Sequence, residues 1–209
     1  MNRGFFITFE GPDGSGKSTQ IRLLEAHCRA HGYQVKLTRE PGGPAISEKI
    51  RALLLDRENA EMTGPTEALL YAAARAQHVA QVIRPAVEEG IVVLCDRFMD
   101  SSIAYQAFGR QLGDDVRVIN EFAVQGMRPD LTFFLDIDPA LGLSRANSHS
   151  APDRLEAEKL EFHQRVYEGY QALKERYSDR YVRIDACDTV EVIAETIARK
   201  FDEYVAERS

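Results

Sequence analysis

Five short segments rich in branched and aromatic side chains recur along the chain. Glycine or proline stands close to several of them. This length and composition predict β-strands. The run IVVLC has no polar residue, which is typical of a parallel strand covered on both faces. The predicted strands are residues 5–9, 33–38, 91–95, 131–135 and 181–184.

Stretches with helical spacing of apolar residues separate these strands. In the first of them, Ile21, Leu24 and Cys28 recur at helical intervals, and Gly32 marks the end of the helix. Strands that alternate with helices form a parallel sheet covered on both faces. The sequence therefore predicts one three-layer α/β/α domain, residues 1–209, around a five-stranded parallel sheet. The predicted helices are residues 17–31, 46–57, 66–89, 114–126, 139–146, 155–177 and 189–207, with loops at 39–45 and 147–153.

Composition narrows the class of protein. Of the 209 residues, 44% are hydrophobic and 28% are charged, the usual profile of a globular protein. The net charge of −7 argues against broad binding to nucleic acid or to anionic membranes. No apolar run approaches the length of about 18 residues that a membrane span needs, and the N-terminal residues do not resemble a signal peptide. Three widely separated cysteines fit a reducing compartment, so we expect a cytoplasmic protein.

A glycine-rich segment follows the first predicted strand. It reads Gly-Pro-Asp-Gly-Ser-Gly-Lys-Ser and fits G-x-x-x-x-G-K-[ST], with the flanking strand and helix that this motif requires. Its glycines allow backbone N–H groups to surround an anion, and the helix N-terminus adds partial positive charge. Lys17 can then reach the β and γ phosphates, and the Ser18 hydroxyl can ligate Mg²⁺. We expect a nucleoside triphosphate to contact Gly11, Pro12, Asp13, Gly14, Ser15, Gly16, Lys17, Ser18 and Thr19.

The phosphate-binding loop leaves three classes of protein open: a small-molecule kinase, a GTPase-like switch, and an ATPase that drives a partner. The N-K-x-D sequence typical of guanine-binding switches is absent. Asp96 and Arg97 follow the buried strand at 91–95. There the Asp96 carboxylate suits the orientation of Mg²⁺ and its waters, and the Arg97 guanidinium can clamp a phosphate. A purely structural Asp–Arg pair is the alternative interpretation.

Several further motifs resemble those of the thymidylate kinase family, in the same order along the chain. Residues 94–106 (LCDRFMDSSIAYQ) resemble its signature of Asp-Arg-aromatic followed by Ser and Ala-Tyr-Gln. Residues 66–78 (TEALLYAAARAQH) resemble one of its helices. Segments 39–43 (REPGG), 128–130 (RPD) and 153–156 (DRLE) complete a series that spans residues 5 to about 186. Several motifs in register are far more specific than a phosphate-binding loop alone.

This resemblance implies a P-loop fold of the nucleoside monophosphate kinase type, with a mobile lid at about 142–156. It also implies transfer of the γ-phosphoryl group of ATP to dTMP, with Mg²⁺ as the metal and a homodimer as the assembly. A monophosphate whose second pKa is about 6 is already a nucleophile at neutral pH. The site therefore needs cations that offset the repulsion between two polyanions, rather than a general base. Another deoxynucleotide or nucleoside kinase, or a nucleotide switch without catalysis, is the alternative.

The resemblance also assigns residues to the acceptor. Arg51 and Arg97 would hold the dTMP phosphate, with Arg39 as a weaker candidate. Tyr71 would stack on thymine, and Arg75, four residues later on the same helix face, would contact its exocyclic oxygen. A solvated Arg51 and a Tyr71 that only packs in the core are the alternatives.

Further positions match the base and the sugar of dTMP. By resemblance, Ser102 and Gln106 would lie near the thymine edge, and Tyr105 would lie beneath the sugar, leaving no room for a ribose hydroxyl. Asp13 would lie near the deoxyribose 3′-hydroxyl. A local turn stabilised by the Asp13 side chain is the alternative for that residue.

The lid departs from that of some relatives. Family members without an arginine in the phosphate-binding loop place catalytic arginines in the lid. This loop has none, and the lid has only Arg145 and Arg154, with His149 between them. By resemblance, Arg145 would contact ATP and Arg154 the transition state, whereas His149 is more simply a solvated loop residue. The catalytic candidates are then Lys17, Asp96, Arg97 and Arg154, and the metal candidates are Ser18 and Asp96.

Overall fold

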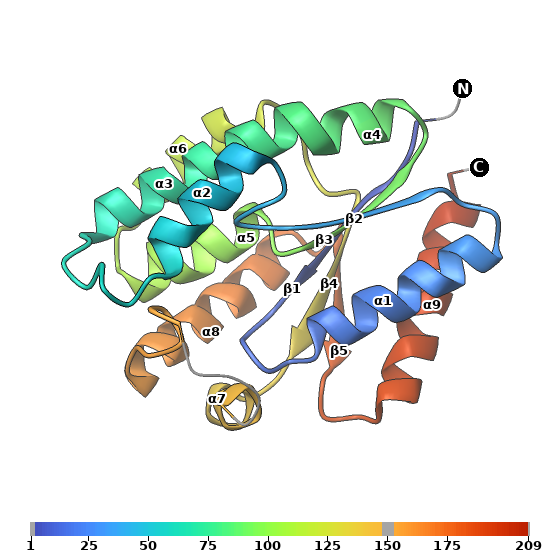
Figure 1. Ribbon diagram of the computed structural model, residues 1–209. Coiled ribbons are helices and arrows are strands. Elements are labelled where there is room, and N and C mark those ends of the chain that lie inside the picture. Colours follow the sequence, from blue (N-terminus) through green and yellow to red (C-terminus); the bar gives the residue numbers. More distant parts are fainter. Residues whose placement is uncertain (1–2, 148–152, 209) are drawn as a thin grey trace.

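The computed structural model describes residues 3–147 and 153–208. Its centre is a sheet of five parallel strands in the order β2-β3-β1-β4-β5 (Figure 1). The predicted three-layer α/β/α class with a parallel sheet is thereby confirmed, and each strand lies within two residues of its predicted bounds. The strands are β1 (Phe6–Glu10), β2 (Val35–Arg39), β3 (Val92–Asp96), β4 (Leu131–Asp136) and β5 (Tyr181–Asp185).

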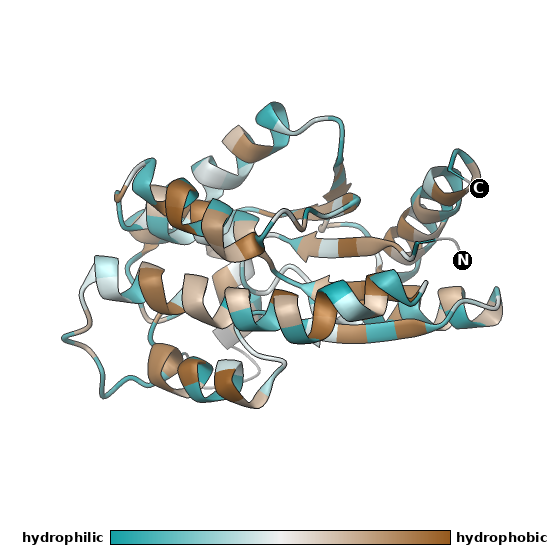
Figure 2. Cartoon of the chain, turned by 90° about the horizontal axis from the view of Figure 1, so that it is seen from above, coloured by the Kyte–Doolittle hydropathy of each residue, from teal (hydrophilic) through white to brown (hydrophobic). Residues whose placement is uncertain are grey.

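Helices cover both faces of this sheet. Apolar side chains of α1 (Lys17–Ala30) and α9 (Val190–Ala206) pack on one face, against a cluster that includes Phe9 and Phe133. On the other face, the ring of Phe6 from β1 packs against the ring of Phe98, with 4.9 Å between the ring centroids. Teal and brown bands alternate along the helices (Figure 2), as expected for amphipathic helices. The second face is covered by α3 (Gly64–His78), α4 (Arg84–Glu88), α5 (Met99–Ser102), α6 (Asp115–Val124) and α8 (Leu160–Arg176).

The long helix predicted at 66–89 is present, but it is not α-helical throughout. A π-helical segment, η1 (Val79–Ile83), joins α3 to α4. Pro85 is the second residue of α4, directly after this junction, and proline has no N–H to complete an α-helical ladder. Widening the helix just before a proline keeps the axis continuous while the backbone bonds change partners.

A second π-helical segment was not predicted from the sequence. It is η2 (Ile103–Gly109), which continues from α5 and packs closely against α8. The helix predicted to begin at 155 begins at Leu160 instead, because residues 154–157 form turns. The Asp153 carboxylate accepts from the backbone N–H groups of Leu155 and Glu156, and such local bonds compete with helix formation.

The carboxyl ends of the strands gather the polar segments. The phosphate-binding loop follows β1, and Asp96 ends β3 beside it. The short helix α2 (Ala45–Leu55) follows β2, and α7 (Pro139–Asn147) follows β4. Ligands of open parallel sheets bind beyond these ends. No helix in the described part of the chain is long and apolar enough to cross a membrane.

Candidate active site

The phosphate-binding loop joins β1 to α1, as its sequence predicts. Gly16 precedes the helix with a φ of 89°, a left-handed conformation that glycine adopts without strain. Gly14 lacks a side chain for a different, steric reason. A Cβ on Gly14 would lie 2.0 Å from the carbonyl oxygen of Gly142, so the loop can pack against α7 only with glycine at this position.

The Lys17 ammonium lies inside the curve of this loop. It is buried and donates to the carbonyl oxygens of Gly11 (3.1 Å) and Pro12 (2.8 Å) and to the Ser15 hydroxyl (3.4 Å). Burial, reinforced by the Arg97 cation, lowers the pKa of Lys17 to about 8. The carbonyl and hydroxyl oxygens around this ammonium are neutral. A phosphate entering the loop would therefore give it an anionic partner.

The Ser18 hydroxyl donates to the Asp96 carboxylate over 3.1 Å. A hydroxyl and a carboxylate are hard oxygen ligands, and Mg²⁺ is commonly held by one or two such groups while the remaining positions are filled by water and substrate phosphates. The pair therefore fits the metal expected with ATP. No cluster of three or more His, Cys, Asp or Glu side chains suited to a metal occurs among residues 3–147 and 153–208.

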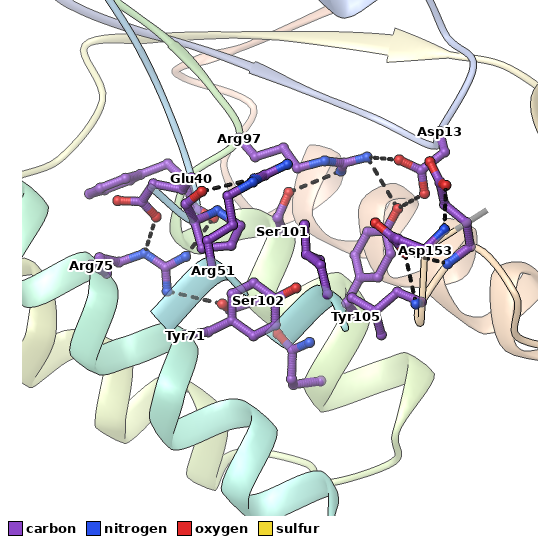
Figure 3. A pocket seen from close by; sticks show the side chains of 16 residues that line it. Asp13, Glu40, Arg51, Tyr71, Arg75, Arg97, Ser101, Ser102, Tyr105 and Asp153 are labelled. Carbon is purple, nitrogen blue, oxygen red and sulfur yellow. Dashed lines mark hydrogen bonds and ion pairs between the residues drawn. The ribbon is translucent and has the colours of Figure 1, made fainter. Parts of the chain in front are cut away.

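Arg97 is the central cation of the site. Its backbone φ is 68°, an uncommon value for a residue other than glycine. Its Nη1 donates to the Gly11 carbonyl (3.0 Å), the Tyr170 hydroxyl (2.9 Å) and Ser101 Oγ (3.2 Å), and its Nη2 to Asp13. These contacts fix the guanidinium beside the loop (Figure 3).

Asp13 links this arginine to the Tyr105 hydroxyl, which donates to Asp13 over 2.8 Å. Burial alone would raise the pKa of Asp13, but the Arg97 and Lys17 cations outweigh it and lower the pKa to about 2. The carboxylate is therefore ionised at neutral pH. The Arg97 guanidinium also lies over the Tyr105 ring, 5.1 Å from its centroid, so both residues are held in one arrangement.

Asp13 and Arg75 line opposite ends of one cavity (Figure 3), and only 1% of the surface of Arg75 is exposed. Its Nε donates to Glu40, its Nη1 to Ser102 (2.9 Å) and Asn120, and its Nη2 to the carbonyl oxygen of Phe98 (3.1 Å). A guanidinium has five N–H donors, so these four bonds leave one Nη2 proton. Tyr71, one helical turn earlier, also lines the cavity.

Two cavities meet beside the phosphate-binding loop. The first contains Arg75, Tyr71, Ser102, Tyr105 and Gln106, and the second contains Lys17, Ser18, Thr19, Asp96 and Arg145. The walls that they share are formed by Asp13, Glu40, Arg51, Arg97 and Glu156.

All of the predicted arginines except Arg154 line one or both of these cavities. Arg51 donates to the Pro41 carbonyl (2.8 Å) and faces both. Arg39 pairs with Glu48 and lines only the loop side, and Arg145 donates to the Ala186 carbonyl (2.9 Å) on that side. Arg154 belongs to neither lining: its Nη2 lies 2.7 Å from Glu67, and its Nε donates to the Leu54 carbonyl. His149 lies outside the described residues.

Comparison with known proteins agrees with this arrangement. The family model for thymidylate kinase matches residues 9–197. The chain belongs to the thymidylate kinase family. It is 52% identical over 205 residues to the thymidylate kinase of Geobacillus sp. (strain WCH70), covering 96% of this chain and 98% of the relative. Identity to that of Geobacillus thermodenitrificans (strain NG80-2) is 54% over 199 residues, 93% and 88% of the two chains. For Clostridium novyi (strain NT) it is 48% over 200 residues, 94% and 98%.

Reasoning from the sequence missed several side chains that build this thymidylate kinase site. Glu10 is fully buried and accepts from the backbone N–H of Phe98 and from Ser101, so it supports the segment that carries Arg97. Glu67 and Asn120 are fully buried as well and bind Gln106 and Arg75. The signal available in the sequence was a charged residue at the end of a buried strand or within an apolar helix. Such residues are rarely buried without a partner, so each of them predicts one.

Proposed function

We propose that the two adjoining cavities are the acceptor and donor sites of one phosphoryl transfer. As a member of the thymidylate kinase family, the chain is an ATP-dependent phosphotransferase that phosphorylates dTMP to dTDP. The observation that carries the proposal for the site is that Arg51 and Arg97 line both cavities. A dTMP phosphate held there by Arg51 and Arg97 would face the γ-phosphate of ATP, and these cations would offset the repulsion between the two groups.

Each side chain at this junction has a defined task in the proposed mechanism. Arg97, preset by Asp13, Ser101 and Tyr170, would exchange some of these partners for the dTMP phosphate. Lys17 would leave the loop carbonyls for the γ-phosphate. Ser18 and Asp96 would hold Mg²⁺, which when bound neutralises charge on the phosphate oxygens. The dTMP phosphate attacks directly, so no side chain has to remove a proton.

The remaining residues would select the nucleotide. The free Nη2 proton of Arg75 would donate to the exocyclic oxygen of thymine, and Tyr71 would stack on the base. Ser102 and Gln106 line the same end of the cavity. Tyr105 and Asp13, joined by their hydrogen bond, would border the sugar.

The two lid arginines would serve the phosphates of ATP and the transition state. Arg145 already faces the loop-side cavity. Arg154 would have to exchange its contact with Glu67 for one with the transferring phosphate.

An acceptor panel tests this function. ADP release is measured by a coupled assay with dTMP, dUMP, dCMP, AMP or water as the acceptor. We expect dTMP to be used best and release with water to be negligible. A different preferred monophosphate would favour another nucleotide kinase, and ADP release that does not depend on an acceptor would favour a nucleotide switch.

We also propose that two copies of the chain form a homodimer through α2, α3 and α6. These helices lie side by side in the structure (Figure 1). Each exposes large apolar side chains, and Phe122 is 87% exposed. Exposed large apolar side chains on neighbouring helices indicate an interaction site. The exposed side chains are Ile46, Leu53, Leu69, Val118 and Phe122.

The cytoplasm is the compartment that we propose for this reaction. ATP and dTMP are intracellular metabolites, and the three cysteines are all free thiols in the structure. Free thiols are the usual state of cysteine in a reducing compartment.

A further inference from the structure

Glu67 is a carboxylate with no solvent exposure at the start of α3. Its Oε1 accepts from Gln106 Nε2 (2.9 Å) and Arg110 Nε (3.2 Å). Its Oε2 accepts from Arg110 Nη2 (3.0 Å) and lies 2.7 Å from Arg154 Nη2, although that last contact lacks hydrogen-bond alignment. Glu67, Tyr71 and Arg75 follow one another at four-residue intervals, so they share the helix face that borders the acceptor cavity.

The contact with Glu67 fixes which end of the Gln106 amide faces which way. Glu67 forms ion pairs with Arg110 and Arg154, and a carboxylate paired with guanidinium groups only accepts hydrogen bonds. The atom of Gln106 that contacts it must therefore be the NH₂ group. The carbonyl oxygen, Oε1, accepts no hydrogen bond from the described residues, and Gln106 lines the acceptor cavity. Gln106 can therefore offer a base its carbonyl oxygen, which accepts hydrogen bonds.

We propose that Glu67 is a positioning residue for base selectivity, acting by holding Gln106 with its carbonyl oxygen available to the acceptor base. The inference rests on the proposed function, in which this cavity holds the base of dTMP. The unused N–H of Arg75 and the free oxygen of Gln106 offer one donor and one acceptor. A 4-oxo pyrimidine with a proton on N3 presents the complementary acceptor and donor. Cytosine presents an amine and an unprotonated N3, so both contacts are mismatched.

Replacing Glu67 by glutamine should reverse the Gln106 amide. Two arginine nitrogens, one of Arg110 and one of Arg154, face the Oε2 position of Glu67, whereas one nitrogen of Arg110 faces Oε1. The oxygen of the new amide would therefore be retained at the Oε2 position. Its NH₂ group would then occupy the Oε1 position and face Gln106. Gln106 would have to turn its own oxygen toward residue 67, and its NH₂ group would become the group available to the base.

The test compares kcat/KM of wild type and Glu67→Gln for dTMP, dUMP and dCMP. Wild type should prefer dTMP to dCMP, and the substitution should reduce this ratio by about tenfold, the value of one exchanged hydrogen bond. The ratio of dTMP to dUMP should not change, because thymine and uracil present the same N3 and O4 groups. A loss that is equal for all three acceptors would overturn the inference and leave Glu67 with a structural role.

Arg110→Met is the matched control, since it removes another partner of the same carboxylate. It should lower the melting temperature and leave the dTMP-to-dCMP ratio unchanged. If that ratio collapses in Arg110→Met as well, general disturbance of the cluster explains the result and the inference fails.

A measurement on the wild-type protein covers the case in which Glu67→Gln does not fold. The side-chain NH₂ signals of Gln106, assigned with a Gln106→Leu variant, should exchange slowly with solvent both without a ligand and with dTMP bound. Rapid exchange, or loss of protection when dTMP binds, would show that the amide does not remain on Glu67. If wild type does not use dTMP at all, the proposed function fails instead, and the state of the Gln106 amide is a separate result.

Discussion

At the scale of single residues, the stability of the Lys17 ammonium depends on what fills the phosphate-binding loop. Its ammonium is buried among two carbonyl oxygens and one hydroxyl, and burial lowers its pKa to about 8. Neutral acceptors compensate a buried charge only in part. An arriving triphosphate would supply full charges, so the arrangement favours phosphate over water in the loop.

Lys17→Ala should therefore leave the fold intact and reduce kcat roughly a hundred- to a thousandfold, the usual cost of removing a group aimed at developing charge. Steady-state ADP release and thermal unfolding measure the two effects. Lys36→Ala, which removes an exposed lysine of β2, is the control and should behave as wild type. Turnover close to normal in a folded Lys17→Ala protein would exclude the assigned role.

Tyr105 is expected to discriminate deoxyribose from ribose. A ribose hydroxyl beside its ring would be crowded and left without a partner, a cost of about 1–3 kcal/mol, or roughly ten- to hundredfold in kcat/KM. Tyr105→Ala should narrow the preference for dTMP over its ribose counterpart, even as total activity falls. Tyr105→Phe should keep the preference if the bulk of the ring is the cause. Unchanged selectivity in both variants would assign the discrimination to another residue.

The sequence could predict residues whose role depends on a contiguous motif. The loop from Gly11 to Ser18 and the pair Asp96-Arg97 are in this class, because the chemistry follows from the order of the residues. Glu10 and Glu67 are not, because their partners come from distant parts of the chain. Nor could the sequence show that Arg154 contacts Glu67, 87 positions away, rather than the loop.

At the scale of elements, η2 is positioned by its contact with α8. Gly169 of α8 lies against this segment, and a Cβ there would be 2.9 Å from the Cα of Ala104 and 3.0 Å from the Phe108 ring. Because η2 carries Tyr105 and Gln106, the spacing between the two helices sets the depth of the acceptor cavity.

Gly169→Ala should destabilise the fold by about 1–3 kcal/mol, as extra volume in a packed core usually does. It should also raise KM for dTMP more than KM for ATP. Urea unfolding and steady-state kinetics measure these effects. Glu168→Ala, at an exposed neighbouring position of α8, is the control. A Gly169→Ala protein as stable as wild type would show that η2 can move away without cost.

The sequence predicts best those elements that lie in a single environment along their whole length, because their residue pattern is then uniform. The strands are buried apolar runs, and the sheet order follows from their alternation with helices. The π-helical turns of η1 and η2 could not be predicted, because the apolar periodicity of a π-helical turn differs little from that of an α-helix over so few residues. At residues 153–158 the Asp153 carboxylate caps a turn, and helical periodicity did not reveal it.

At the scale of the whole molecule, the exposed apolar surface of α2, α3 and α6 predicts self-association. Phe122→Glu would replace the 87% exposed apolar side chain of α6 by a charge and should convert the dimer to a monomer. Sedimentation velocity measures the change. Val192→Glu, which alters an exposed apolar residue of α9, is the matched control and should remain dimeric. A wild-type protein that is monomeric at all concentrations would contradict the proposed dimer.

Arg97 is important for substrate binding because the molecule as a whole is negatively charged. The chain has a net charge of −7, yet its two substrates are anions, so binding must depend on the few cations that line the cavities. Arg51 and Arg97 are the arginines on the walls shared by both cavities, among the residues described. If the two cavities are the acceptor and donor sites, removing Arg97 should affect the two substrates unequally.

Isothermal titration of dTMP and ATP into wild type and Arg97→Ala tests where the two substrates bind. Loss of charged hydrogen bonds to the acceptor phosphate should weaken dTMP binding roughly ten- to a hundredfold, while the affinity for ATP changes little. Arg97→Lys should also bind dTMP poorly, because an ammonium cannot reproduce the planar guanidinium. A folded Arg97→Ala protein that binds dTMP as wild type does, or that loses ATP instead, would contradict the placement of the acceptor site.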